Sequence, residues 1–173
     1  MSEGPRRGER FRIFRGSDGR DCDLMTSEQL EDETEAMARM AAQGPLDFGH
    51  DLKVLFDMPG LSLIRVWFKS GYPLPRHTHN VDCVYYITGG SIRIGHEELR
   101  AGDGFFVGAD VPYTYVPGEE GVELLEIRPS NSFDIKVMGN WPVTQAKVLK
   151  TVQARQAAWA QEANPPKPGD VAA

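Results

Sequence analysis

Cysteine is scarce in this sequence, and long apolar runs are missing. Of 173 residues only Cys22 and Cys83 are cysteines, so no disulfide framework is available, and we expect a reducing cytoplasm as the compartment. The apolar runs are short, as at Cys83–Ile87, whereas a membrane-spanning helix needs about 20 apolar residues. The charged N-terminus has no apolar segment behind it, which predicts that no secretory signal is present. We therefore expect that the protein is neither a membrane protein nor a secreted one.

An excess of positive charge is also missing. The chain has 19 Lys and Arg against 25 Asp and Glu, a net charge of −6 at pH 7. A surface that holds a phosphate backbone needs clustered cations, so we expect no nucleic-acid partner. Hydrophobic residues make up 40% and charged residues 25%, the balance of an ordinary globular protein. The length then favours one folded domain with additions at its ends.

The chain divides into three segments by its patterns. Residues 1–45 contain a polar leader, a short alternating stretch and a capping box, Thr26 followed three residues later by Gln29. Residues 46–137 change to short apolar stretches, and residues 138–173 carry helical spacing before a Pro-rich tail. The elements predicted at the two ends are a strand at Phe11–Phe14, a helix over 26–43 and a helix over Thr144–Ala163.

The middle segment, residues 46–137, is predicted to form an all-β barrel or sandwich. Many short strands separated by Gly and Pro are typical of such folds, and they do not alternate with helices as in βαβ units. Gly89–Gly90 is predicted to turn one hairpin, and Pro117–Gly118 to mark another turn. The candidate strands are Lys53–Phe56, Ser62–Phe68, Asp82–Thr88, Ser91–Ile94, Glu97–Leu99, Gly104–Val107, Thr114–Val116 and Val122–Arg128.

Two of the four histidines, His77 and His79, stand two positions apart. Side chains at i and i+2 of a strand point to the same face, so both imidazoles are predicted to converge inside the barrel. Such a pair suits Fe, Zn, Ni, Cu or Mn; the alternative is a pair of histidines without a metal. His96 lies in a predicted turn and is expected in solvent, and His50 is expected in a loop before the first barrel strand.

Two stretches of the sequence resemble the two motifs of the cupin superfamily. The first motif matches Gly71-x5-His77-x-His79-x3-Cys83-x6-Gly90, and the second matches Gly102–Asp103, Val107 and Val111–Pro112–Tyr113. The resemblance implies a small double-stranded β-helix barrel, a jelly roll, which is often dimeric and holds a metal in its mouth. It therefore agrees with the all-β barrel predicted from the strand pattern.

The sequence departs from the cupin pattern at two metal-ligand positions. The family's usual Glu is Cys83 here, and its last His is Tyr113. A thiolate is a good ligand for Zn or Fe, and alternation places Cys83 on the face of the two histidines; the alternative is a small buried hydrophobe. Three roles are open for Tyr113. It could be a metal ligand, it could hydrogen-bond the substrate or act as an acid or base, or it could be a core aromatic that closes the barrel. Asp82 is a reserve ligand that a regular strand directs outward.

Aromatic residues gather in and around the two motifs and favour a small, mostly apolar organic substrate. Alternation predicts that Tyr85 points inward with Cys83 and that Tyr86 points outward. Arg65, Lys69 and Arg93 are strand residues for which we weigh two placements, inward to pair with a substrate carboxylate and outward into solvent. The aromatic residues concerned are Trp67, Phe68, Tyr72, Tyr85, Tyr86, Phe105, Phe106, Tyr113 and Tyr115.

The sequence leads to one main functional hypothesis and one rival. The main hypothesis is a metal-dependent cupin enzyme for a small carbonyl- or carboxylate-bearing molecule, with lyase, isomerase or dioxygenase chemistry at a divalent Fe, Zn, Ni or Mn. Its metal ligands are His77, His79, Cys83 and Tyr113, and Tyr113 and Cys83 are its catalytic candidates. The rival is a non-catalytic ligand-binding or structural cupin whose metal site has decayed. In both cases we expect a homodimer.

Overall fold

The structure, a computed structural model, describes residues 11–21 and 48–163. The predicted helix over residues 26–43 and Cys22 lie outside the described residues. In the part that is described, no helix is long and apolar enough to cross a membrane.

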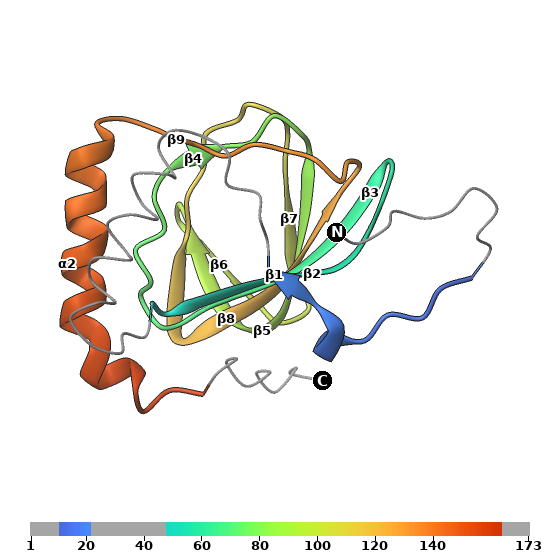
Figure 1. Cartoon of the computed structure of the whole chain (residues 1–173). Coiled ribbons are helices and arrows are strands. Elements are labelled where there is room, and N and C mark those ends of the chain that lie inside the picture. The colour runs from blue at the N-terminus through green and yellow to red at the C-terminus, as the bar shows by residue number, and fades with distance from the viewer. Residues whose placement is uncertain (1–10, 22–47, 164–173) are drawn as a thin grey trace.

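Seven strands form one antiparallel sheet in the order β1-β2-β3-β8-β5-β6, and β7 also pairs with β5. The sheet curls around a core and, with the short pair β4–β9, makes a barrel beside which the helix α2 lies (Figure 1). The β-barrel predicted for the middle segment is therefore present. The strands are β1 Arg20–Asp21, β2 His50–Met58, β3 Leu61–Phe68, β4 His77–Thr78, β5 Cys83–Ile94, β6 Glu97–Arg100, β7 Gly104–Val107, β8 Val116–Arg128 and β9 Lys136–Val137, with a 3-10 turn, η1, at Gly16–Asp18 and α2 at Trp141–Trp159.

Alternation along the strands builds the core. In β5, Cys83, Tyr85 and Ile87 are buried, whereas Val84 and Tyr86 between them are exposed. Successive side chains of a strand point to opposite faces, so this pattern directs one set into the barrel. The predicted inward placement of Tyr85 and outward placement of Tyr86 are confirmed.

Gly89 and Gly90 do not turn a hairpin, so that prediction was wrong. The two segments predicted around them are one continuous strand, β5, which pairs with β8 through two register shifts near these glycines. Gly90 has φ 69°, and a Cβ there would lie 2.1 Å from the carbonyl oxygen of Gly121. The glycine is needed because two strands approach closely at a bulge, and the sequence signal of such a site is the same as that of a turn.

Two other local predictions were also wrong. Pro117–Gly118 lies inside β8 rather than in a turn, and β8 runs unbroken from Val116 to Arg128. Phe11–Phe14 forms no strand, although its residues alternate; the strand that pairs with the β2 edge is β1, at Arg20–Asp21. A strand of alternating residues forms only where a neighbouring edge offers hydrogen bonds.

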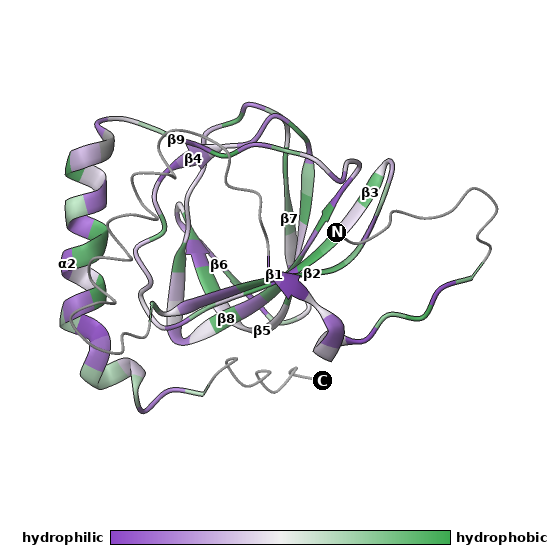
Figure 2. Ribbon diagram, in the orientation of Figure 1, coloured by the Kyte–Doolittle hydropathy of each residue, from purple (hydrophilic) through white to green (hydrophobic). Residues whose placement is uncertain are grey.

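The predicted C-terminal helix is present as α2, which begins at Trp141 and ends at Trp159. The side chain of Asn140 caps it by accepting a hydrogen bond from the backbone of Val143. Its hydrophilic and hydrophobic residues are interspersed (Figure 2), and it is held at its C-terminal end. There the buried Trp159 indole donates to the Ser70 carbonyl at 3.0 Å, and the Lys69 ammonium donates to the Trp159 carbonyl at 2.6 Å.

Candidate functional site

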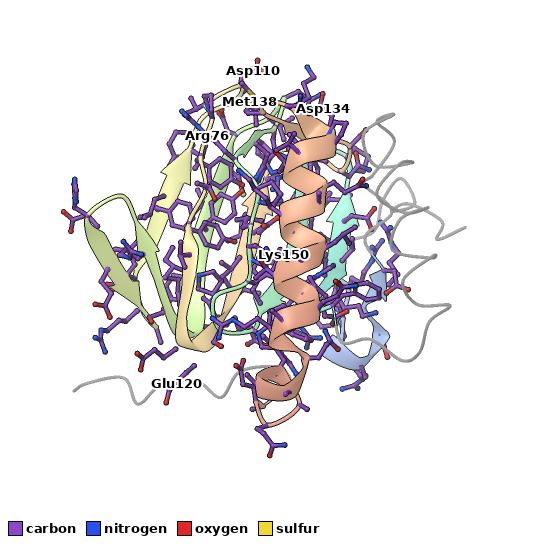
Figure 3. The ribbon with its side chains drawn as sticks, turned by 90° about the vertical axis from the view of Figure 1, so that its left-hand side faces the viewer. Arg76, Asp110, Glu120, Asp134, Met138 and Lys150 are labelled. Carbon is purple, nitrogen blue, oxygen red and sulfur yellow. The ribbon has the colours of Figure 1, made fainter. Side chains whose placement is uncertain are left out.

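His77 and His79 lie at one end of the barrel, and both are buried. The strand β4 covers only His77–Thr78, so His79 lies just beyond the strand whose spacing predicts the convergence of the two rings. The two rings still meet, with centroids 5.0 Å apart and planes at 79°. Asp134, whose backbone contacts His79, lies at this end of the molecule with Asp110 and Met138 (Figure 3).

Backbone carbonyls hold both imidazoles in the same tautomer. Nδ1 of His77 donates to the Pro75 carbonyl at 2.7 Å, and Nδ1 of His79 donates to the Asp134 carbonyl at 2.6 Å. A ring that donates from Nδ1 has its lone pair on Nε2 when it is neutral. The same arrangement, with one nitrogen tied to a carbonyl, orients histidines that bind metals.

Burial keeps the two histidines neutral near pH 7. Desolvation lowers the pKa of His77 below its ordinary value. For His79 burial, helped by the nearby Arg128 cation, lowers the pKa to about 4. A metal binds the neutral imidazole, so neither ring must lose a proton before it can act as a ligand.

The Tyr113 hydroxyl connects the histidine pair to a chain of hydrogen bonds. Because Nε2 of His77 is an acceptor, the Tyr113 hydroxyl is the donor in their 2.9 Å contact. The Tyr113 oxygen then accepts from the Tyr85 hydroxyl, and the Tyr85 oxygen accepts from Nη2 of Arg128 at 3.3 Å. Burial, followed by the Glu126 charge, raises the pKa of both tyrosines well above the ordinary value, so both phenols keep their protons.

Glu126 and Arg128 form a buried pair that was not predicted from the sequence. Nη1 of Arg128 donates to the Glu126 carboxylate, and the guanidinium lies 4.0 Å from the centre of the Phe133 ring. Burial alone would lower the Arg128 pKa, but the Glu126 charge raises it above its ordinary value, and the guanidinium stays charged. The sequence signal for this pair is spacing. Residues two positions apart on a strand point to the same face, and Glu126 and Arg128 share the inward face of β8 with Leu124.

Cys83 shares the inward face of β5 with Tyr85, as alternation predicts. Its Sγ donates to the Val84 carbonyl at 3.6 Å. Burial, followed by the Glu126 charge, raises the pKa of the thiol to about 12. The group is thus a neutral thiol in this structure, and its role as a metal ligand stays a prediction.

Several other predicted candidates lie away from this site. His96 is exposed in the turn between β5 and β6. The Asp82 carboxylate accepts from the backbone of Ala109 at 2.8 Å, where it fixes a loop. His50 begins β2 rather than lying in a loop before it, and its ring packs against Tyr72 at 5.1 Å.

The three cations considered as inward candidates are all engaged elsewhere or exposed. Arg65 is half-buried, with Nη2 3.6 Å from the Asp51 carboxylate. Lys69 is buried but bonds the C-terminal end of α2, and Arg93 is exposed. The cation in the barrel is instead Arg128.

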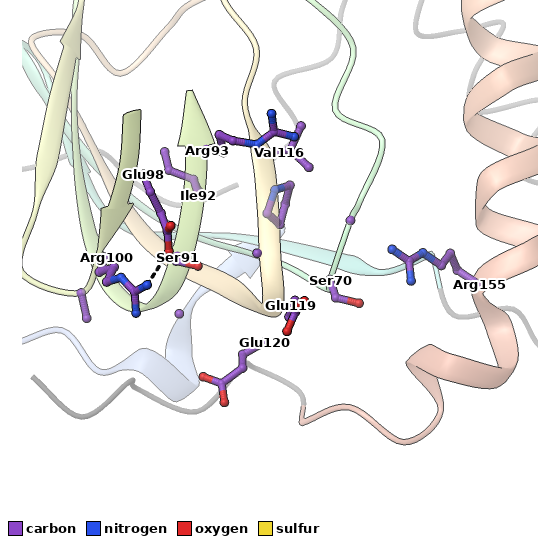
Figure 4. Close-up of a pocket in the computed structure, with 15 residues that line it drawn as sticks. Ser70, Ser91, Ile92, Arg93, Glu98, Arg100, Val116, Glu119, Glu120 and Arg155 are labelled. Atoms are coloured by element: carbon purple, nitrogen blue, oxygen red, sulfur yellow. Dashed lines mark hydrogen bonds and ion pairs between the residues drawn. The ribbon is translucent and has the colours of Figure 1, made fainter. Parts of the chain in front are cut away.

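A groove of about 1210 Å³ lies elsewhere on the molecule, between the barrel and α2 (Figure 4). Arg93, Arg155 and Glu119 are among its lining residues, and neither His77 nor Tyr113 is. Its arginines and glutamates are mixed, and Arg100 pairs with Glu98 at 2.6 Å. Because positive and negative side chains are mixed, the groove favours neither an anionic nor a cationic ligand. The end of the barrel that holds His77 and His79 therefore remains the candidate site.

Comparisons with known proteins find likenesses among solved structures. No protein-family model matches, and no curated protein matches. An RmlC-like cupin from Shewanella frigidimarina NCIMB 400 is 25% identical, with TM-score 0.42, over 50% of this chain and 82% of that chain. The polyketide cyclase RemF from Streptomyces resistomycificus is 17% identical, with TM-score 0.47, over 60% and 84%. A salicylate 1,2-dioxygenase from Pseudaminobacter salicylatoxidans is 18% identical, with TM-score 0.45, over 65% and 37%.

The structural neighbours include a cupin, the family that the two sequence motifs resemble. All three identities are 25% or lower and all three TM-scores lie below 0.5, so no activity is carried over from these proteins. What the site does must be argued from the residues of this chain.

Proposed function

We propose that this cupin-type barrel is an enzyme for a small organic molecule that bears a carbonyl or carboxylate group, with His77 and His79 holding a divalent transition metal. The observation that carries the proposal is the shared tautomer of the two rings. Both Nδ1 atoms are tied to backbone carbonyls at 2.6–2.7 Å, so both Nε2 lone pairs are available as ligands.

The donor set fits a metal that keeps open coordination positions. No group of three or more His, Cys, Asp or Glu side chains arranged for a metal occurs among the described residues. The histidines are therefore the two nitrogen donors, and the Tyr113 oxygen, 2.9 Å from His77 Nε2, is a further donor beside them. A bound divalent metal would supply a Lewis acid that polarises a substrate carbonyl.

Tyr113 is proposed as the acid–base residue rather than as a permanent ligand. Its phenol is neutral, and its hydroxyl donates to Nε2 of His77, the nitrogen that would bind the metal. If Nε2 of His77 were bound to a metal, the Tyr113 hydroxyl would be released to donate to a substrate oxygen, while the Tyr85 hydroxyl would still donate to the Tyr113 oxygen. A proton donor positioned beside a metal could serve lyase, isomerase or dioxygenase chemistry.

A specific observation favours the rival function, a non-catalytic small-ligand barrel. Four polar side chains of the site already bond one another in the Arg128–Tyr85–Tyr113–His77 chain. A barrel that recognises a ligand by hydrogen bonds needs no metal. The two functions differ in metal content, which decides between them.

Metal analysis of the protein purified without chelator tests the proposal. We expect close to one divalent transition metal per chain in the wild type, and less than half of that in His77→Ala and in His79→Ala. His96→Ala is the matched control, because His96 is exposed in the turn between β5 and β6, and it should keep the wild-type content. A wild type that stays metal-free after reconstitution with Fe, Zn, Ni and Mn contradicts the enzyme proposal and supports the rival.

A further inference from the structure

The strands β4 and β9 form a short antiparallel ladder beside the two histidines. At one end of this ladder the backbone N–H of Met138 donates to the Arg76 carbonyl at 2.8 Å, and both residues lie at the same end of the molecule as Asp134 (Figure 3). In an antiparallel ladder every second pair of residues exchanges backbone hydrogen bonds. Two such pairs further along, the register of β4 and β9 sets Asn80 opposite Asp134.

Side-chain oxygens replace the backbone carbonyls as acceptors at this pair. The backbone N–H of Asn80 donates to Oδ1 of Asp134 at 3.0 Å, and the backbone N–H of Asp134 donates to Oδ1 of Asn80 at 3.0 Å. In a regular ladder the two backbone carbonyls would accept these hydrogen bonds. Asn and Asp have short side chains that can imitate a backbone acceptor in this way. We refer to this reciprocal pair of hydrogen bonds as the Asn80–Asp134 clasp.

The clasp leaves the Asp134 carbonyl to the ring of His79. Nδ1 of His79 donates to this carbonyl at 2.6 Å. The backbone of His79 is fixed separately, because its own carbonyl accepts from the backbone N–H of Asp110 at 2.7 Å. The ring packs against Phe133, with centroids 5.6 Å apart and planes at 82°, and that contact is apolar. The Asp134 carbonyl is therefore the polar group that selects the nitrogen of His79 that carries the proton.

We propose that Asn80 and Asp134 are positioning residues for His79: their clasp presents the Asp134 carbonyl to Nδ1 and so keeps the Nε2 lone pair available to a metal. The metal part of this inference rests on the proposed function, whereas the tautomer is a property of the metal-free protein. His77 needs no clasp, because its acceptor, the Pro75 carbonyl, lies only two positions away in the chain. The acceptor of His79 lies 55 positions away, so a separate contact must bring it to the ring.

The role assigned to Asp134 depends on a hydrogen bond and not on its charge. Oδ1 of Asp134 takes part in the clasp. Oδ2 lies 3.5 Å from the Lys136 ammonium, in an ion pair whose side chains are 32% and 62% exposed, and such pairs contribute little. An amide oxygen accepts the Asn80 N–H as a carboxylate oxygen does. Asp134→Asn should therefore preserve the clasp, and Lys136→Ala should preserve it too.

The tautomer of His79 in the metal-free protein, measured by ¹⁵N NMR of its ring nitrogens, tests the proposal. In the wild type His79 should carry its proton on Nδ1. In Asp134→Ala the Asn80 N–H loses its acceptor and competes with His79 for the backbone carbonyl at position 134, so part of the His79 population should carry the proton on Nε2. The zinc Kd should rise about tenfold or more, as when a ligand histidine loses its hydrogen-bond partner. Asn80→Ala removes the other half of the clasp and should shift both readouts in the same direction.

Asp134→Asn and Lys136→Ala are the matched controls, and both should keep the wild-type tautomer and zinc Kd. His77 is an internal reference whose tautomer should be the same in all variants. A His79 proton that stays on Nδ1 in both alanine variants would overturn the proposal. An equal shift in Asp134→Asn and Asp134→Ala would also overturn it, since the charge of Asp134 would then orient the ring. If the tautomer shifts as expected but even the wild type binds no zinc, the clasp is confirmed and the proposed metal function fails.

Discussion

Tyr113 and His77 are joined twice, once through their backbones and once through their side chains. The two backbones exchange a pair of hydrogen bonds of 3.0 Å each. The Tyr113 hydroxyl donates to Nε2 of His77 at 2.9 Å across 36 positions of sequence. This double link ties the end of one sequence motif to the histidines of the other and fixes the hydroxyl against the ring nitrogen.

Tyr113→Phe should destabilise the protein measurably while the metal is retained. The substitution keeps the ring but leaves Nε2 of His77 and the Tyr85 hydroxyl without their shared partner. An unsatisfied buried polar group costs about 1–3 kcal/mol, so we expect a loss of that size in the free energy of unfolding of the metal-free protein, measured with urea. Metal content should remain near the wild-type value because both histidines are unchanged.

Tyr86→Phe is the control for that experiment. Tyr86 is adjacent in β5 but 46% exposed on the outer face, so its change should leave both stability and metal content as in the wild type. If Tyr113→Phe loses its metal, Tyr113 is a ligand rather than an acid–base residue. If its stability equals that of the wild type, the hydrogen-bond chain described here does not exist in solution.

Glu126→Gln should be far more damaging than Glu98→Gln. Each glutamate pairs with an arginine two residues further along the chain, but Arg128 has 0% exposed side chain and Arg100 has 73%. Removing one charge of a buried pair costs about 3–5 kcal/mol because the other charge is left uncompensated. An exposed pair contributes about 1 kcal/mol or less. Urea unfolding measures both, and equal losses would mean that the Glu126–Arg128 pair is solvated.

The metal-free protein should lose stability as the pH falls from 7 to 5. The pKa of His79 is lowered to about 4 by burial, whereas an unfolded histidine titrates near 6.5. Between these values the unfolded chain binds the extra proton, so this contribution is complete above pH 6.5 and is lost on the way down to pH 4. His79 alone accounts for about 2 kcal/mol between pH 7 and pH 5, and His77 acts in the same direction.

Urea unfolding at the two pH values checks this prediction, with His79→Gln and His96→Ala as the informative variants. His79→Gln should show a smaller loss of stability between pH 7 and pH 5, because one titrating group is gone. His96→Ala should show the wild-type loss. Equal pH dependence in His79→Gln and the wild type would contradict the burial of a neutral His79.

The barrel and the convergence of His77 and His79 could be predicted because they depend on local periodicity. Alternation gave the inward placement of Cys83 and Tyr85, and i,i+2 spacing brought His77 and His79 together although β4 is only two residues long. The prediction of a turn at Gly90 was wrong because glycine is favoured at a positive φ both in a bulge and in a turn. Only the pairing with the neighbouring strand β8 distinguishes a bulge from a turn here.

The shared tautomer of His77 and His79 and the hydrogen-bond chain from Arg128 to His77 could not be predicted from the sequence. The two imidazoles donate to the backbone carbonyls of Pro75 and Asp134. Every residue has a backbone carbonyl, so the sequence does not reveal which ones accept. The inward placement of Glu126 and Arg128 could have been predicted, because both stand at even spacing from Leu124 on β8. A charged pair in a strand is usually an exposed one, however, and only its position inside the closed barrel makes it buried.

The shared tautomer of His77 and His79 and their role as metal ligands are tested most directly by ¹⁵N NMR of the histidine ring nitrogens while the metal-free protein is titrated with zinc. Before zinc, His77 and His79 should both show a protonated Nδ1 and an unprotonated Nε2. One equivalent of zinc should shift Nε2 of these two rings and leave both Nδ1 protons in place, with no change at the exposed His96. Metal-free rings that carry their protons on Nε2 would contradict the shared tautomer, and Nε2 resonances that one equivalent of zinc leaves unmoved would contradict the metal site.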